Sequence, residues 1–111
     1  NNSVENNFLH NISRSKSYSK ITFHKTKSDF FFENNKKTFN LIYIDGCHEE
    51  KFIINDMENS FRYLEKGGVM WMDDYEGNSG KIKHIMDRFL EKYKEKIKII
   101  HKGYQIAIKK L

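Results

Sequence analysis

The chain has 111 residues, a net charge of +5, one cysteine and no proline. This length supports one domain, or part of one, and apolar runs of only four or five residues exclude a transmembrane span. A single cysteine excludes an internal disulfide framework and is typical of a reducing, cytoplasmic location, and the opening NNSVENN carries neither a secretory signal pattern nor a methionine, so we expect residues upstream.

The N-terminal third predicts short elements separated by polar segments. Apolar residues at spacings of four, one and three predict an amphipathic helix over 4–12, followed by a serine-rich loop. ITFH, residues 21–24, predicts a short strand. Ser28 is suited to cap a brief helical turn over 29–33, which the NNKK stretch at 34–37 ends.

The middle of the chain predicts a strand and a helix. FNLIYID, residues 39–45, is apolar on both faces, as expected for a strand inside a parallel sheet. Residues 49–65 predict a helix with one apolar stripe, made of Ile54, Met57, Phe61 and Leu64. Gly67 and Gly68 follow, and we expect one of them to form a left-handed helix cap.

The C-terminal part predicts a strand over 69–72, a loop, a helix over 80–94, and two further strands over 97–101 and 104–110. The spacing of apolar residues in this helix predicts one apolar face, made of Ile82, Ile85, Met86, Phe89, Leu90 and Tyr93. Lys102 and Gly103 form a two-residue connection of the kind that closes a β-hairpin. The order of strands and helices predicts an α/β fold in which helices cover a mostly parallel sheet.

Two of these strands end on acidic residues. Asp45 follows the strand over 39–44, and Asp73 and Asp74 follow the strand over 69–72. Ligands of open α/β sheets bind outside the carboxyl ends of the strands, and oxygen ligands suit Mg²⁺ or Ca²⁺. Neighbouring strand residues point to opposite faces, so both Asp73 and Asp74 can face one ion only if the chain turns there. The alternative is that Asp45 caps the next helix and one of the pair is merely solvated.

Other reactive side chains near these acids have competing interpretations. His48 is a candidate general base because imidazole titrates near neutral pH, but it can equally cap the helix or lie exposed. Cys47 lacks a partner base and is interpreted as a small turn residue. GNSGK, residues 77–81, lacks the earlier glycine and the Ser or Thr of a phosphate-binding loop.

The basic residues gather near the C-terminus. Residues 1–80 carry a net charge of −2 and residues 81–111 one of +7. Such a tail can attract phosphates, but no aromatic or arginine pattern for base readout accompanies the lysines. We therefore interpret the lysines as solvating a helix end and a strand, with nucleic-acid binding as the alternative.

Taken together, FNLIYIDGCHE, LEKGGVMWMDDY and IMDRFLEKYKEKIKIIHKGYQIAIKK, with the earlier FLHNI and ITFHKTKSD, resemble class I S-adenosylmethionine-dependent methyltransferases. The resemblance is to methyltransferase family 24, which includes metal-dependent O-methyltransferases. It covers nearly the whole chain but only the later part of the family's domain. It therefore implies that residues 1–111 are the C-terminal part of a single Rossmann-like methyltransferase domain, whose sheet ends in an antiparallel hairpin.

The resemblance also implies roles for individual residues. S-adenosylmethionine would be the cofactor, with Mg²⁺ held by Asp45, Asp73 and Asp74. His48 matches the histidine of a D-G-x-H pattern and would be a base or substrate contact, with Asp45 beside the reaction centre. Ser28 resembles a position near the adenine of the cofactor, with Asp29 beside it, and Asp45 would also be a cofactor contact. The acceptor would be a hydroxyl of a small molecule or sugar.

One part of the family pattern is absent from this sequence. No glycine-rich loop follows a first strand anywhere in the 111 residues, and LEKGG lacks the usual proline. We therefore expect an incomplete sheet without its first strands, and an inactive chain unless an upstream half, or a second copy in a homo-oligomer, completes it. The alternative is a non-catalytic remnant that serves as an interaction module.

Overall fold

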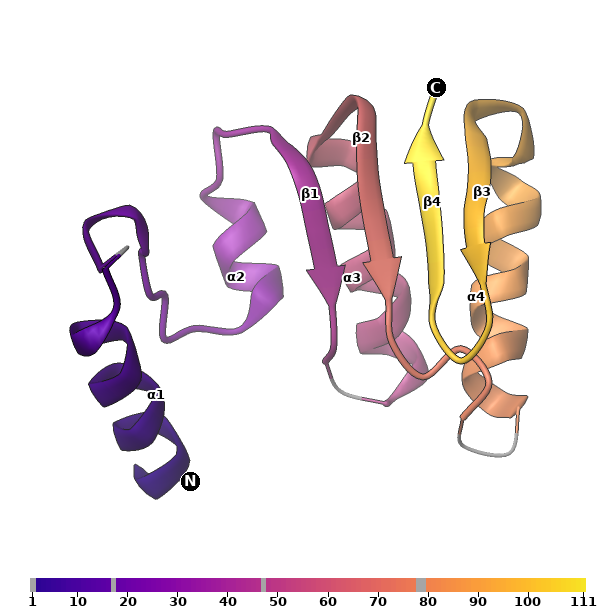
Figure 1. The fold of residues 1–111 in the computed structure, drawn as a ribbon. Helices are drawn as coiled ribbons and strands as arrows, with labels where there is room; N and C mark the ends of the chain where they lie inside the picture. Colours follow the sequence, from indigo (N-terminus) through magenta and orange to yellow (C-terminus); the bar gives the residue numbers. More distant parts are fainter. Residues whose placement is uncertain (1, 17, 47, 78–79) are drawn as a thin grey trace.

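The computed structural model describes residues 2–16, 18–46, 48–77 and 80–111, which form an α/β structure. Its four-stranded sheet has the order β1-β2-β4-β3 (Figure 1). β1 (Phe39–Ile44) pairs parallel with β2 (Leu64–Met72), and β4 (Ile106–Lys110) pairs antiparallel with β2 and with β3 (Ile97–Lys102). β1, β2 and β3 therefore run in the same direction and β4 runs against them, which agrees with the prediction of a mostly parallel sheet that ends in an antiparallel hairpin.

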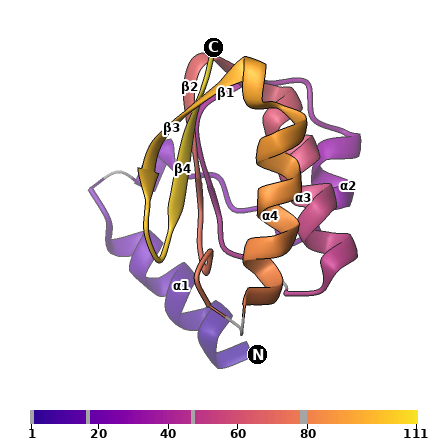
Figure 2. The ribbon, with the colours of Figure 1, turned by 90° about the vertical axis from the view of Figure 1, so that its right-hand side faces the viewer.

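The hydrophobic core lies between one face of this sheet and two helices. Figure 2 shows α3 (Glu50–Tyr63) and α4 (Lys81–Lys92) packed side by side on that face. Met70 and Ile108 are register partners at the sheet centre, and both are fully buried. The predicted apolar face of α4 is confirmed, since its members are buried: Ile82, Ile85, Met86, Phe89 and Leu90.

The helix α3 is shorter than predicted and runs directly into β2. It ends at Tyr63, so the glycines do not cap it; Gly67 instead takes a φ of 84° inside β2, where the pairing with β1 shifts register. The Lys110 ammonium donates hydrogen bonds to the carbonyls of Phe61 (2.7 Å) and Leu64 (2.9 Å). The Leu64 N–H also donates to the Phe61 carbonyl, so Lys110 adds a charged donor at the C-terminal end of α3.

The apolar stripe of α3 also differs by one position. Ile53 is 6% exposed, whereas the predicted Ile54 is 37% exposed. Met57 and Phe61 are buried as predicted. The helix begins at Glu50, and its packing against α4 selects Ile53, which lies four residues before Met57, one helical turn away.

The second face of the sheet is not covered by any helix in the described ranges. Leu41 and Tyr43, on β1, are 62% and 54% exposed. The prediction that β1 is buried on both faces is wrong, because β1 is an edge strand of this sheet and lacks a covering layer. Across the same face Tyr43 pairs with Trp71, and Trp71 with Ala107.

The N-terminal segment lies apart from the sheet (Figure 1). The predicted helix is confirmed as α1 (Asn2–Arg14), and a single 3-10 turn, η1 (Tyr18–Lys20), follows. Residues 21–24 pair with no strand, so the predicted strand there is wrong. α2 (Ser28–Glu33) confirms the brief helix, but Ser28 is its first residue rather than its cap.

The C-terminal hairpin is confirmed with a different turn. β3 and β4 are joined by residues 103–105, not by Lys102 and Gly103 alone, because the second strand begins only at Ile106. A 3-10 turn, η3 (Lys94–Lys96), leads into β3. In the described part of the chain, no helix has the length and apolar character needed to cross a membrane.

Candidate functional site

The ends of β1 and β2 bring three carboxylates together. The two strands are parallel neighbours, and the Asp73 backbone N–H still donates to the Ile44 carbonyl at 3.0 Å. One carboxylate oxygen from each of Asp45, Asp73 and Asp74 lies within 4.8 Å of the others. Asp45 is exposed, while Asp73 and Asp74 are half-buried.

The backbone conformation at Asp74 explains how the side chains of the adjacent Asp73 and Asp74 can lie close to the same site. Asp74 has a φ of 61°, which turns the chain out of the strand, and the Gly77 N–H donates to the Asp74 carbonyl at 3.0 Å. Side chains of consecutive strand residues would face opposite sides of the sheet. The left-handed conformation, in which Asp is among the better tolerated residues, removes that opposition. The turn lies at Asp74 itself rather than in the loop after it.

Three neighbouring side chains, His48, Tyr104 and Gln105, hydrogen-bond to the acidic pair. His48 Nε2 lies 2.7 Å from Asp74 Oδ2, and the Tyr104 hydroxyl donates to Asp74 Oδ1 at 2.6 Å. The Gln105 amide donates to Asp73 Oδ1 at 3.0 Å and to the Tyr43 hydroxyl at 2.9 Å. The structure thus brings the predicted His48 into contact with the predicted acids. The N-cap residue of α3 is Glu49, whose side chain makes no capping hydrogen bond. Neither Asp45 nor His48 therefore caps that helix.

The surroundings of Asp45 and Asp74 shift the pKa values of these two acids in opposite directions. Loss of solvent around its carboxyl, followed by the charge of Asp73, raises the pKa of Asp45 above its usual value. The hydrogen bond from Tyr104, together with His48, lowers the pKa of Asp74, although partial desolvation opposes this. Hydrogen bonds to the charged form of a carboxyl favour that form, whereas a like charge nearby disfavours it. The charged form of Asp74 is therefore favoured, whereas the charged form of Asp45 is disfavoured.

The two other predicted cofactor contacts lie in an adjoining pocket of about 430 Å³. It is lined by Lys27, Ser28, Asp29, Gly46, Phe52 and Asp56. Gly46, which directly follows Asp45, and Asp56 line both this pocket and the small cavity around the carboxylates. Ser28 and Asp29 do not touch the three acids.

Asp56 on α3 connects the two cavities and was not predicted. The Ser28 hydroxyl donates a short hydrogen bond to Asp56 Oδ1, and a Cβ on Gly46 would lie 3.0 Å from Asp56 Oδ2. Burial raises the pKa of Asp56, while the Ser28 hydrogen bond opposes the rise. An aspartate in the second turn of a helix gives no sequence signal for such a contact.

Tyr104 and Gln105 were also missed, although a signal existed. They directly precede β4, whose first residue, Ile106, pairs with Met72 at the end of β2. In an antiparallel neighbour, the residues before the strand lie beside the acids that follow Met72. Recognising the pairing of β4 with β2 would have pointed to them. The predicted turn residue Cys47 and part of the GNSGK stretch lie outside the described residues.

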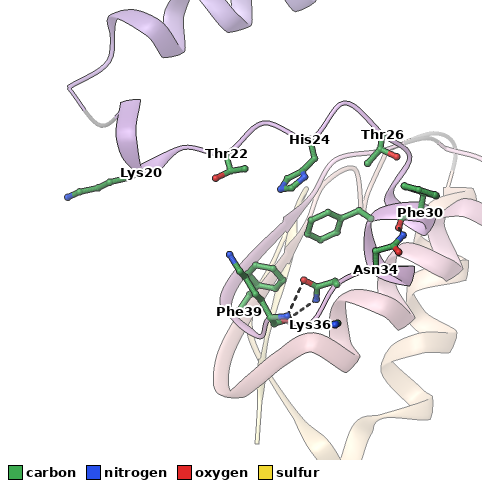
Figure 3. A pocket seen from close by; sticks show the side chains of 11 residues that line it. Lys20, Thr22, His24, Thr26, Phe30, Asn34, Lys36 and Phe39 are labelled. Atoms are coloured by element: carbon green, nitrogen blue, oxygen red, sulfur yellow. Dashed lines mark hydrogen bonds between the residues drawn. The ribbon is translucent and has the colours of Figure 1, made fainter.

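A cavity larger than the two beside the acids lies away from them. Figure 3 shows a cleft, of about 710 Å³, between α2 and the segment that carries Lys20, Thr22, His24 and Thr26. Its wall includes Phe39, the first residue of β1, whereas Asp45 follows the last residue of that strand. The acid cluster has the more specific chemistry of the two and is the candidate functional site.

A comparison with protein families identifies the chain. The family model described as a methyltransferase domain matches residues 2–75, a range that holds α1, α2, β1, α3, β2 and all three acids. A search of curated proteins found no match. Because the match spans well over half of the 111 residues, the chain belongs to methyltransferase domain family 24.

Proposed function

We propose that this protein is an S-adenosylmethionine-dependent methyltransferase that methylates a hydroxyl of a small molecule or sugar with the help of Mg²⁺. The observation that carries the proposal is the meeting of Asp45, Asp73 and Asp74 at the ends of two parallel strands. Membership of the methyltransferase family supplies the reaction class, and S-adenosylmethionine is the typical cofactor of that family.

The donor set fits a hard divalent cation. All three ligands are carboxylate oxygens within 4.8 Å of one another, and Mg²⁺ and Ca²⁺ prefer oxygen ligands. Asp45, Asp73 and Asp74 would hold the ion. When bound there, Mg²⁺ lowers the pKa of an acceptor hydroxyl and orients its oxygen.

The pocket beside the acids is suited to the cofactor. Ser28 and Asp29 supply polar groups and Phe52 an aromatic wall, and Gly46 joins this pocket to the acid cluster. Asp45 would lie between cofactor and acceptor. Such pockets combine apolar surface with a few placed polar groups.

His48 is proposed to accept the acceptor's proton. Its Nε2 contact with Asp74 favours the tautomer protonated on Nε2, which leaves the Nδ1 lone pair free to act as a base. In the transfer, the acceptor oxygen forms a bond to the methyl carbon as the carbon–sulfur bond breaks. The sulfur takes that electron pair and becomes a neutral thioether, while the hydroxyl proton passes to His48.

We also propose that a second polypeptide segment completes the site. The open edge of β1, with exposed Leu41 and Tyr43, supports pairing with another strand, from an upstream half or another copy. The same edge is the observation that favours the second candidate function, a non-catalytic interaction module. Nucleic-acid binding has less support, since Lys92 pairs with Glu58 and Lys94 with Glu91.

Calorimetric titration of the intact protein with S-adenosylmethionine, with and without Mg²⁺, tests the proposal. We expect cofactor binding and Mg²⁺-dependent methylation of a hydroxyl compound, detected with a methyl-labelled donor. Asp73→Asn should abolish the Mg²⁺ dependence, whereas Glu91→Gln, which removes an exposed charge from the solvent-facing side of α4, should not change it. Absence of cofactor binding in both conditions would refute the methyltransferase function and favour the interaction module.

A further inference from the structure

We propose that the turn of the β3–β4 hairpin positions the carboxylates of the cation site through Tyr104 and Gln105. This inference rests on the proposed function, since it concerns the cation that Asp45, Asp73 and Asp74 would hold. It adds two positioning residues from a part of the chain that lies beyond the family match, which ends at residue 75.

The hairpin turn packs directly on the acidic loop. Ile106 pairs with Met72, so residues 103–105 run beside the chain that follows β2. The Glu76 N–H donates to the Tyr104 carbonyl at 3.3 Å, and a Cβ on Gly77 would lie 3.2 Å from the Tyr104 hydroxyl. The loop therefore contacts the hairpin through both backbone and side chain, and any shift of the hairpin would move the loop.

Each of the adjacent acids receives one neutral donor from this turn. Tyr104 donates to Asp74 Oδ1, and Gln105 donates to Asp73 Oδ1. Hydrogen bonds to metal ligands orient the ligands and raise metal affinity. A phenol and an amide carry no charge, so they fix the carboxylates without cancelling the negative field that attracts a cation.

The hydrogen bonds from Tyr104 and Gln105 hold the carboxylates in place against their mutual repulsion. Carboxylates within 4.8 Å of one another repel, and an unrestrained Asp74 would rotate away in the absence of a cation. Gln105 also donates to the Tyr43 hydroxyl, which links the turn to β1 and hence to the strand that precedes Asp45. The hairpin thus connects to both strands that carry the ligands.

The inference is tested by measuring Mn²⁺ binding to the chain with electron paramagnetic resonance. Tyr104→Phe and Gln105→Leu should each raise the Mn²⁺ Kd by roughly tenfold or more, the usual effect of removing such a partner. Each should also alter the spectrum of the bound ion, which reports ligand geometry. Tyr104 is 58% exposed, so loss of its hydroxyl opens no core. Tyr63→Phe, at the end of α3, is the matched control and should leave Kd and spectrum unchanged.

The outcomes separate this inference from the proposed function. If the wild type binds Mn²⁺ and Asp73→Asn abolishes that binding, the cation site stands. If both hairpin variants then keep the wild-type Kd and spectrum, the positioning role of Tyr104 and Gln105 is overturned. Wild-type chain that binds no Mn²⁺, or binds it as Asp73→Asn does, overturns the site and the inference with it. Circular dichroism verifies folding of each variant, and Gln105→Leu decides the matter if Tyr104→Phe fails to fold.

Discussion

Replacing Tyr75 by phenylalanine should change how stability depends on pH. Tyr75 follows the acidic pair, its ring is fully buried, and its hydroxyl donates to Asp87 Oδ1 on α4 at 2.5 Å. Burial, followed by the hydrogen bond to Asp87, raises the pKa of Tyr75 to about 12 from 10.0. The buried phenol anchors the loop that carries Asp73 and Asp74.

The sign follows from linkage. The folded state disfavours the phenolate, so the stabilisation is fully present below about pH 10 and is lost as pH rises through about 12. A difference of two pKa units corresponds to about 2.7 kcal/mol of unfolding free energy, about half of it lost by pH 11. At pH 7 the variant loses only a hydrogen bond to a carboxylate, about 1.5 kcal/mol.

Urea denaturation of both proteins from pH 7 to pH 11 measures the effect. Other titrating groups are common to both proteins and cancel in the difference between their unfolding free energies. We expect wild type to be more stable by about 1.5 kcal/mol at pH 7 and the difference to vanish near pH 11. A difference that stays constant over this range would refute the assigned burial of the phenol.

Three further predictions concern the core, the helix end and the acids. Ile108→Ala should lower the free energy of unfolding by about 2–5 kcal/mol in urea, because Ile108 is fully buried, whereas Ile100→Ala, at a 47% exposed residue, should cost less than about 1 kcal/mol. Lys110→Met should lower it by about 1–3 kcal/mol, since the carbonyls of Phe61 and Leu64 lose a charged donor; an unchanged denaturation midpoint would contradict this role. Asp73→Asn should lower the pKa of Asp45, measured by carbon NMR titration, because the charge of Asp73 helps to raise it; a pKa that stays in place would assign the rise to desolvation alone.

Local patterns in the sequence were sufficient to predict those features that depend on residues close together in the chain. The amphipathic spacing of α4 predicted its buried face, and the acid-ended strands predicted where Asp45 and Asp73 would lie. Periodicity and parallel pairing carry this information, because side chains on one helix face or at one sheet edge need no distant partner to be placed together.

The tertiary structure decided the features that depend on distant partners. The 21–24 segment has strand-like residues but no neighbouring strand, so no ladder forms there. The carbonyls of Phe61 and Leu64 at the end of α3 accept hydrogen bonds from Lys110, which lies near the far end of the chain. The turn at Asp74 and its contact with Tyr104 likewise join residues 30 positions apart.

The sequence by itself therefore determined which residues could form the acidic cluster and the order of the elements that carry it. Only the tertiary structure determined that Asp74 turns back toward Asp73, and that the hairpin supplies the hydrogen bonds that hold both. The physical reason is that hydrogen bonds to carboxylates are set by the placement of β4 beside β2, which is a pairing between strands and not a property of either strand alone.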